Sequence, residues 1–378
     1  MRIDAREDQT AARVVGQAGA RVGGAPTRSI VRLEVTDRLR EWAPQWDALV
    51  AQGDPPTPLW RSWALEARDS SFLRYLLVRR GETLLGGLVV DLRTSTGLRT
   101  PVVRFPQECA TSLDLLSTPG HEEVVAALVA EWFASHRNLV VDLFDLRPAS
   151  RLPHVVRGNM TITAIGDAPY VQLPGDFGSY LAGRSRNFRS GLKRDRRRLE
   201  EAGYRHRVLA PDENGVGLTA LYRLHRMRHG DDSDFLPWFD TFARIAYAGA
   251  AAGEFRFDVL ARDDEIIAIE AMFQVGPYIN DFQGGRDVAR DAARGAGTVL
   301  VAAIIEDACT RDVAELDLHY GFVSWKRRFT DTVRPVVRLH STRGWAPVWI
   351  PRAKRLAAGL RSATPGRSGT AHKAAGDA

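Results

Sequence analysis

Apolar and polar positions in the first half of the chain follow the periods of strands and helices. Residues 72–78 and 84–92 are apolar runs on either side of a polar turn, which is the pattern of a β-hairpin. Residues 122–135 repeat apolar side chains at helical spacing, and 139–144 form a short apolar run. We therefore expect two strands, a helix and a further strand in this order.

The same order of elements returns in the second half. The apolar segments 255–260 and 266–275 flank a charged turn, and a third apolar segment, 278–283, follows a Gly-Pro pair. An apolar helical pattern then covers 298–309, and 314–319 again alternates like a strand. The second half is thus expected to be a hairpin, a third strand, a helix and a fourth strand.

The two halves keep a constant spacing when their patterns are superposed. Glu131 falls on Glu306 and Asp142 on Asp317, each 175 positions apart, and the two hairpins keep an offset of 183 positions. A chance match is the alternative, because this order of elements is common. The constant offset favours an internal duplication, and the expected fold class is α/β, with two tandem domains whose mixed sheets are flanked by helices.

The expected domain boundaries follow from composition. The two domains are placed at 29–165 and 166–345. Residues 1–28 and 346–378 are rich in alanine, glycine and polar residues, which is typical of flexible ends, and the second of these segments is also basic.

Composition restricts the class of protein. With 44% hydrophobic and 26% charged residues, the 378-residue chain is globular rather than disordered or collagen-like. Cys109 and Cys309 form no zinc-binding pattern, which favours a reducing compartment. No apolar run approaches the roughly 20 residues that span a bilayer, and the N-terminal segment lacks the apolar region of a secretory signal. We expect a cytoplasmic protein.

The net charge of +6 is concentrated in a few segments. Residues 184–198 contain eight arginines and lysines and a single acidic residue, Asp195. This basic helix suggests an anionic partner. Arg186 and Arg189 are its candidate substrate-binding residues. Three interpretations compete, namely a solvated helix face, a clamp on an anionic sugar or a CoA phosphate, and a contact with an RNA backbone.

A glycine-containing loop precedes the last predicted helix. Residues 284–297 lead into the helix N-terminus, where unpaired backbone N–H groups favour a phosphate or pyrophosphate, and Arg290 and Arg294 add positive charge. Neither a P-loop nor a GxGxxG motif is present. A plain turn is the alternative. The corresponding first-half loop, 117–123, ends in two glutamates that would repel a phosphate.

This order of elements resembles the core of the GNAT N-acyltransferases, and a tandem pair resembles the CelD-type and, more distantly, the Fem-type members of that superfamily. The resemblance covers about residues 170–340 well and 30–165 only weakly. The segments that carry it are 186–200, 221–228, 253–257, 316–321 and 325–329.

The resemblance implies acyl transfer from an acyl-CoA, such as acetyl-CoA, to an amine. It also implies that the CoA pyrophosphate is held by Arg290, Arg294, Gly295, Ala296, Gly297 and Thr298. The segment 278–283 is then the strand that pairs with the pantetheine amides.

Acyl transfer to an amine needs a group that removes a proton. The candidates are Asp281 on the third strand and Asp317 and His319 on the fourth, where alternation places both on one face. His319 has an ordinary pKa close to working pH, although a structural histidine is the alternative. Tyr320 is a candidate donor to the leaving thiolate, or else a hydrogen-bonded structural tyrosine.

Three further residues are candidate substrate contacts. Lys326 suits a substrate carboxylate or phosphate, with a surface lysine as the alternative, and Glu270 is a charge inside an apolar strand. Gln283 ends the third strand. His225 and His229 share a helix face, but two arginines and no carboxylate lie between them, so no metal site is expected.

The leading hypothesis is a CoA-dependent N-acyltransferase acting on a small molecule or an envelope or polysaccharide precursor. A second hypothesis keeps the fold and replaces CoA by aminoacyl-tRNA. A third is a non-catalytic protein that binds anions or a membrane surface through the basic helix and the tail, where residues 345–356 mix aromatic and basic side chains. The acyl group, the acceptor and the oligomeric state do not follow from the sequence.

Overall fold

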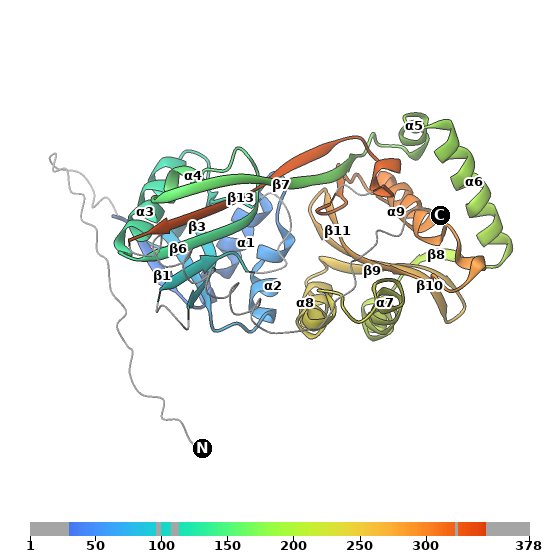
Figure 1. The fold of residues 1–378 in the computed structure, drawn as a ribbon, viewed down its shortest axis with the longest axis horizontal. Coiled ribbons are helices and arrows are strands. Elements are labelled where there is room, and N and C mark those ends of the chain that lie inside the picture. Colours follow the sequence, from blue (N-terminus) through green and yellow to red (C-terminus); the bar gives the residue numbers. More distant parts are fainter. Residues whose placement is uncertain (1–29, 96–99, 107–112, 322–323, 345–378) are drawn as a thin grey trace, which may run out of the picture.

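The computed structural model describes residues 30–95, 100–106, 113–321 and 324–344. The predicted terminal segments and Cys109 lie outside these residues. Figure 1 shows two lobes side by side, joined by two long strands that run along the top of the view from one lobe to the other. None of the described helices is both long and apolar enough to cross a membrane.

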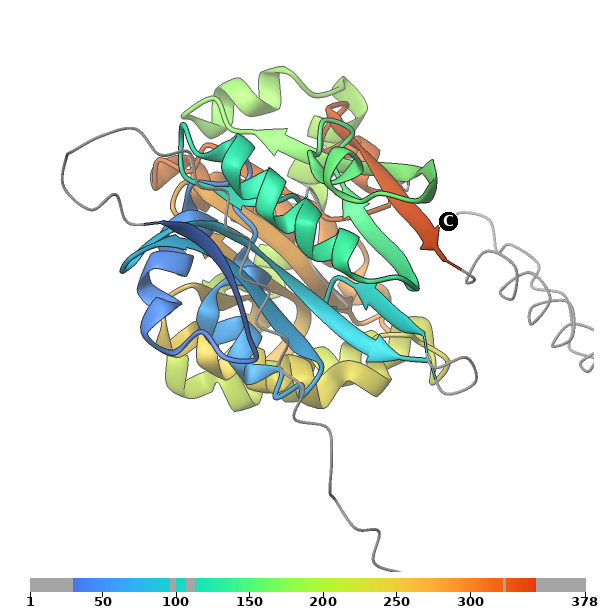
Figure 2. The same ribbon diagram turned by 90° about the vertical axis from the view of Figure 1, so that its left-hand side faces the viewer.

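The first lobe contains the predicted hairpin, helix and strand. Strands β2, β3 and β4 are antiparallel neighbours, and β6 lies parallel to β4 after the chain has passed through α3. Figure 2 views this lobe with α3 lying across its sheet. The elements are β1 (Val31–Thr36), α1 (Ala43–Ala51), α2 (Ser62–Ala67), β2 (Leu73–Arg80), β3 (Thr83–Thr94), β4 (Pro101–Arg104), β5 (Leu116–Ser117), α3 (Glu122–Ser135), β6 (Leu139–Leu146) and α4 (Leu152–Val155).

The second lobe repeats this topology. Strands β9, β10 and β11 are antiparallel neighbours, and β12 lies parallel to β11 after α9. The pair β11/β12 therefore corresponds to β4/β6. The elements are α5 (Phe177–Ala182), α6 (Arg186–Glu201), β8 (Arg205–Val208), α7 (Asn214–His229), α8 (Phe239–Ala251), β9 (Phe255–Arg262), β10 (Glu265–Val275), β11 (Tyr278–Arg286), α9 (Ala296–Thr310) and β12 (Glu315–Asp317).

Two long strands connect the sheets of the lobes. Strand β13 (Val333–Arg343) lies between β6 and β7 (Asn159–Gln172), and the end of β7 pairs with β12. Among the described residues the strands thus form one continuous 13-stranded sheet. The C-terminal strand is part of the first lobe's sheet, and the boundary expected after residue 165 falls within β7.

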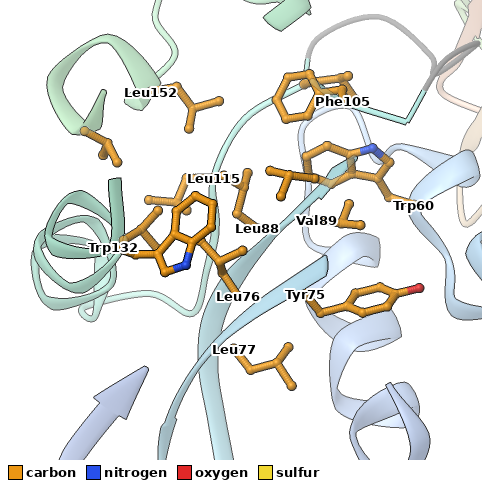
Figure 3. Close-up of a cluster of buried hydrophobic side chains, with 14 of the residues drawn as sticks. Trp60, Tyr75, Leu76, Leu77, Leu88, Val89, Phe105, Leu115, Trp132 and Leu152 are labelled. Atoms are coloured by element: carbon orange, nitrogen blue, oxygen red, sulfur yellow. The ribbon is translucent and has the colours of Figure 1, made fainter. Parts of the chain in front are cut away.

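Helices cover both faces of the sheet, which confirms the α/β class. The first-lobe core gathers around Trp60, Tyr75 and Trp132 (Figure 3). In the second lobe α9 buries one face of the sheet and α7 with α8 the other. This last cluster also takes in Leu59 and Ala64 from the first lobe, so the lobes share an apolar interface.

One predicted element differs in a way that affects the site. The strand expected at 314–319 ends at Asp317, because His319 adopts a left-handed backbone with φ 63°. The chain therefore turns away from the sheet at the residue expected to supply the base. The predicted helix at 122–135 agrees with α3, and the helix expected at 298–309 extends to 296–310.

Candidate active site

Strands β11 and β12 pair only briefly and then separate. Their last matched residues are Asn280 and Asp317, whereas β11 continues to Arg286. Within β11, the register against β10 shifts so that Phe282 has no partner, which marks a bulge. Among the described strands none pairs with the β12-facing edge of β11 beyond Asn280. Backbone groups at this edge are therefore available to a ligand.

Two carboxyl groups meet beside this opening. Glu270 of β10 and Asp281 of β11 are hydrogen-bonded to each other. Burial raises the pKa of both groups: that of Glu270 lies well above its usual range, and that of Asp281 is about 7. Glu270 is the protonated donor and Asp281 the acceptor. The pair can thus take up one proton near neutral pH.

Glycine at position 284 makes room for this pair. Gly284 is the β11 residue opposite Glu270. A Cβ at that position would overlap the Glu270 carboxylate. The absence of a side chain therefore lets the carboxylate lie against the strand.

Lys326 is buried rather than exposed, so the surface-lysine alternative is wrong. Only 8% of its surface is accessible. Its Nζ donates hydrogen bonds to the carbonyl oxygens of His319 (3.1 Å) and Tyr320 (2.9 Å). Burial lowers the pKa of Lys326, and the charges of Asp281 and Asp317 oppose that shift. The lysine thus holds the chain after β12 in place and puts a positive charge near the carboxyl pair.

His319 is not poised near neutral pH as the sequence suggested. Burial lowers its pKa to about 4, although the charge of Asp317 opposes the shift. Its ring meets the Phe282 ring edge-on, with centroids 5.6 Å apart. The backbone N–H of His319 donates to Oδ1 of Asp317 (2.7 Å), and its buried Nε2 has no hydrogen-bond partner among the described residues. Neutral His319 offers a polar atom to a ligand but is a weak base.

Tyr320 lies on the first-lobe side of the same segment. Its hydroxyl donates a hydrogen bond to the carbonyl oxygen of Ile165. The residue is 41% exposed and forms part of the wall of a cavity in the first lobe.

The predicted anion-binding loop reaches α9 as expected, but one of its arginines is neutralised. Gly295 precedes the helix in a left-handed conformation (φ 78°) and, as a glycine, has no capping side chain of its own. The carboxylate of Asp195 lies beside it. Arg290 forms ion pairs with Glu265 and with Asp287 (3.2 Å). Arg294 is exposed. The backbone N–H groups of Ala296, Gly297 and Thr298, in the first turn of α9, are therefore the candidate anion-binding groups of this loop.

The predicted basic helix is α6, and it packs along α9 (Figure 1). Arg196 forms an ion pair with Glu306 of α9, and Arg198 donates to the carbonyl of Arg294. Arg189 donates to carbonyl oxygens at the end of α5. Arg186, on the outer face, is exposed. Part of the basic run thus stabilises local structure next to the α9 loop.

The remaining predicted contact, Gln283, lies against α7. Its amide is 2.6 Å from Nδ1 of His225, whose other ring nitrogen is 2.6 Å from the Ser233 hydroxyl.

In the described part of the chain, no three His, Cys, Asp or Glu side chains are grouped as metal ligands. Two features were missed by the sequence analysis: the Glu270–Asp281 contact and Asp145 in the first lobe. No local pattern signals either.

Comparisons with known proteins agree with this architecture. Residues 186–327 match a family model described as an acetyltransferase (GNAT) domain. No curated protein matches the sequence significantly.

Among solved structures, FemX is similar with a TM-score of 0.57 at 11% identity, covering 80% of this chain and 94% of FemX. A conserved protein of Bacteroides thetaiotaomicron gives a TM-score of 0.57 at 9% identity, covering 82% and 100%. The C-terminal domain of a putative lysylphosphatidylglycerol synthetase from Agrobacterium fabrum gives 0.54 at 12% identity, covering 80% and 92%. These similarities establish a shared fold.

Proposed function

We propose that this chain, whose residues 186–327 match an acetyltransferase (GNAT) domain model, transfers an acyl group from an acyl-CoA, acetyl-CoA in the first instance, to an amine. The acceptor class is a small molecule or an envelope or polysaccharide precursor, as the CelD-type resemblance implies. The two lobes are proposed to be tandem GNAT-like domains, of which the second, 166–345, carries the donor site.

The donor site is proposed at the opening between β11 and β12. The unpaired edge of β11 beyond Asn280 offers backbone donors and acceptors for an amide-containing chain, and the first turn of α9 offers N–H groups and the positive end of the helix dipole for a pyrophosphate. Arg294 is an exposed cation at the same turn. These features suit an extended thioester that ends in phosphates.

The observation that carries the proposal is the Glu270–Asp281 pair. An acyl thioester supplies an electrophilic carbonyl carbon. As the amine nitrogen bonds to that carbon and the C–S bond breaks, the proton lost by the amine passes to Asp281. The departing thiolate takes up a proton, for which Tyr320 or solvent is the donor. A carboxyl group with a pKa of about 7 is matched to this task at neutral pH.

The test compares Asp281→Asn with wild type. Acetyl-CoA is expected to bind both proteins, measured by calorimetry and by thermal stabilisation. With a panel of amines, CoA release by wild type should rise with pH up to about 7 and then level off, because Asp281 must be ionised. Asp281→Asn should lose that dependence and lower kcat by about 100-fold or more.

The control is Asp263→Asn, in the exposed turn between β9 and β10, which should behave as wild type. Failure of acetyl-CoA to bind, or an unchanged pH profile in Asp281→Asn, would overturn the proposal.

A second candidate function uses an aminoacyl-tRNA as the donor. The exposed cations of α6 beside the α9 loop favour it, because a row of Arg and Lys suits a phosphate backbone. It is distinguished in the same experiment: tRNA binding that weakens steeply with salt, together with no binding of acetyl-CoA, would favour this alternative.

A further inference from the structure

The first lobe has a large cavity at its own parallel strand pair. Because β4/β6 corresponds to β11/β12, the cavity occupies the position that matches the donor opening of the second lobe. Its volume is about 870 Å³. The lining residues that matter here are Arg104, Asp142, Phe144, Asp145, Tyr320 and Arg338.

This cavity does not suit the phosphates that the second-lobe site suits. The helix that follows β4, namely α3, carries Glu122 and Glu123 in its first turn. Acidic side chains at a helix N-terminus satisfy its positive end and repel an anion. The loop before α9 has arginines at the corresponding place, so the two lobes differ in the charge of the ligand they favour.

The two arginines of the cavity already share one carboxylate. Arg338 donates two hydrogen bonds to Asp142, of 2.7 Å and 2.9 Å. Nε of Arg104 lies 3.9 Å from Oδ2 of the same carboxylate. Asp142 is buried. These three groups therefore form a fixed network that offers no free carboxylate to a ligand.

Asp145 is different, because its carboxylate has no ion pair or hydrogen bond among the described residues. Burial raises its pKa to about 6. The same cavity is lined by Phe144, Tyr320 and Ile165, and its two arginines are the ones paired with Asp142. A partly desolvated carboxylate that has no paired cation is stabilised by a ligand that carries a positive charge.

The cavity also borders the candidate catalytic groups. Tyr320 in its wall directly follows His319, and the carbonyl oxygens of both residues accept hydrogen bonds from Lys326. The charge of Lys326 in turn acts on Asp281. A molecule in the cavity therefore lies against the chain segment that directly follows β12.

We propose that the first-lobe cavity is the acceptor site and that it selects a primary amine in its ammonium form. Asp145 binds the ammonium group, and Phe144 and Ile165 contact the apolar or aromatic body of the amine. This inference rests on the proposed acyltransferase function. Binding at Asp145 selects the cation. The bound ammonium group first gives one proton to solvent and becomes the nucleophilic amine. As the C–N bond forms and the C–S bond breaks, a second proton passes from the nitrogen to Asp281, and the departing thiolate takes up a proton from solvent.

The test measures binding of phenethylamine and of its neutral counterpart 2-phenylethanol by calorimetry, at about pH 8, where Asp145 is ionised. The variant is Asp145→Asn. Asn accepts a left-handed backbone as readily as Asp, so the φ of 63° at this position is kept. The matched control is Asp312→Asn, an exposed aspartate with φ 53° in the turn after α9.

Phenethylamine is expected to bind wild type and Asp312→Asn with the same affinity. It should bind Asp145→Asn at least about tenfold more weakly, because a charged hydrogen bond is lost. Weak binding of 2-phenylethanol should be the same in all three proteins. In turnover, Asp145→Asn should raise the KM for the amine and leave the KM for acetyl-CoA unchanged.

The outcomes separate this inference from the proposed function. If acetyl-CoA binds but phenethylamine does not bind wild type, or binds Asp145→Asn as well as wild type, the acceptor-site inference is wrong and the acyltransferase proposal stands. If phenethylamine shows the expected dependence on Asp145 but acetyl-CoA does not bind, the donor proposal fails. The cavity is then an amine-binding site with another role.

Discussion

At the scale of single residues, the site depends on how burial changes ordinary acid–base groups. Desolvation penalises the charged form of each group, so it raises the pKa of Asp281 to about 7 and lowers that of His319 to about 4. Two of the three candidates for the base, Asp281 and His319, are thereby separated. Asp281 can exchange a proton near neutral pH, whereas His319 stays neutral. Lys326 moderates the first shift through its positive charge.

The charge of Lys326 predicts the direction in which the Lys326→Met substitution shifts the pH dependence of kcat/KM. Removing the cation should raise the pKa of Asp281 further, so the midpoint of the pH dependence of kcat/KM should move to higher pH than in wild type. Steady-state kinetics across pH measures this. Lys326→Arg keeps the charge and is expected to keep the midpoint. A midpoint that stays in place, or falls, in Lys326→Met would show that Asp281 is not the titrating base.

At the scale of elements, the pairing of β10 with β11 brings the side chains of Glu270 and Asp281 together. The bulge at Phe282 shifts the register, so that Glu270 faces Gly284 rather than a residue with a side chain. The nearest atoms to a Cβ at position 284 all belong to the Glu270 carboxylate, the movable end of a flexible side chain. A small change on one strand can therefore displace a functional group of the next without disturbing the sheet.

Gly284→Ala should fold and bind acetyl-CoA as wild type does. It should displace Glu270 and lower kcat by about tenfold or more, because Asp281 loses the hydrogen-bond donor that helps to set its pKa. Thermal unfolding, calorimetry and kinetics measure the three quantities. Gly191→Ala is the control, because a Cβ there reaches no atom closer than 4.0 Å. Unchanged kcat in Gly284→Ala would argue against a role for the pair.

At the scale of the whole molecule, contacts far apart in the sequence join the lobes. Arg61 of the first lobe forms two hydrogen bonds with Glu254 of the second, of 2.8 Å and 2.6 Å. Trp63 donates to the same carboxylate at 2.7 Å. Arg61 and Glu254 are both mostly buried. Together with the continuous sheet through β7 and β13, these contacts favour unfolding as one cooperative unit.

Glu254→Gln should lower the free energy of unfolding by about 2 kcal/mol, because it weakens a partly buried, charge-assisted contact between the lobes. Urea denaturation measures the loss. As the comparison, Glu201→Gln removes an exposed partner of Arg197 and should cost no more than about 0.5 kcal/mol. Equal losses in the two variants would mean that the contact between Arg61 and Glu254 adds no more than a surface ion pair.

Much of the fold was predictable from the sequence, because strands, helices and turns follow from local periodicity. The hairpins and α3 lie where the apolar pattern predicted them, and the loop before α9 was identified from its glycines and arginines. The strand that ends at Asp317 was predicted to be too long. The residues after it alternate like a strand, although His319 turns out of the sheet. The pattern carries no signal for that turn.

The sequence by itself thus determined the order of elements and which residue types lie near the site. It also suggested an internal duplication. Only the tertiary structure decided that β13 inserts between β6 and β7, that Lys326 is buried, and that Glu270 meets Asp281. The reason is physical: local periodicity sets backbone conformation, whereas burial and charge pairing depend on neighbours distant in the chain. Those neighbours fix the pKa values and the cavity on which the chemistry depends.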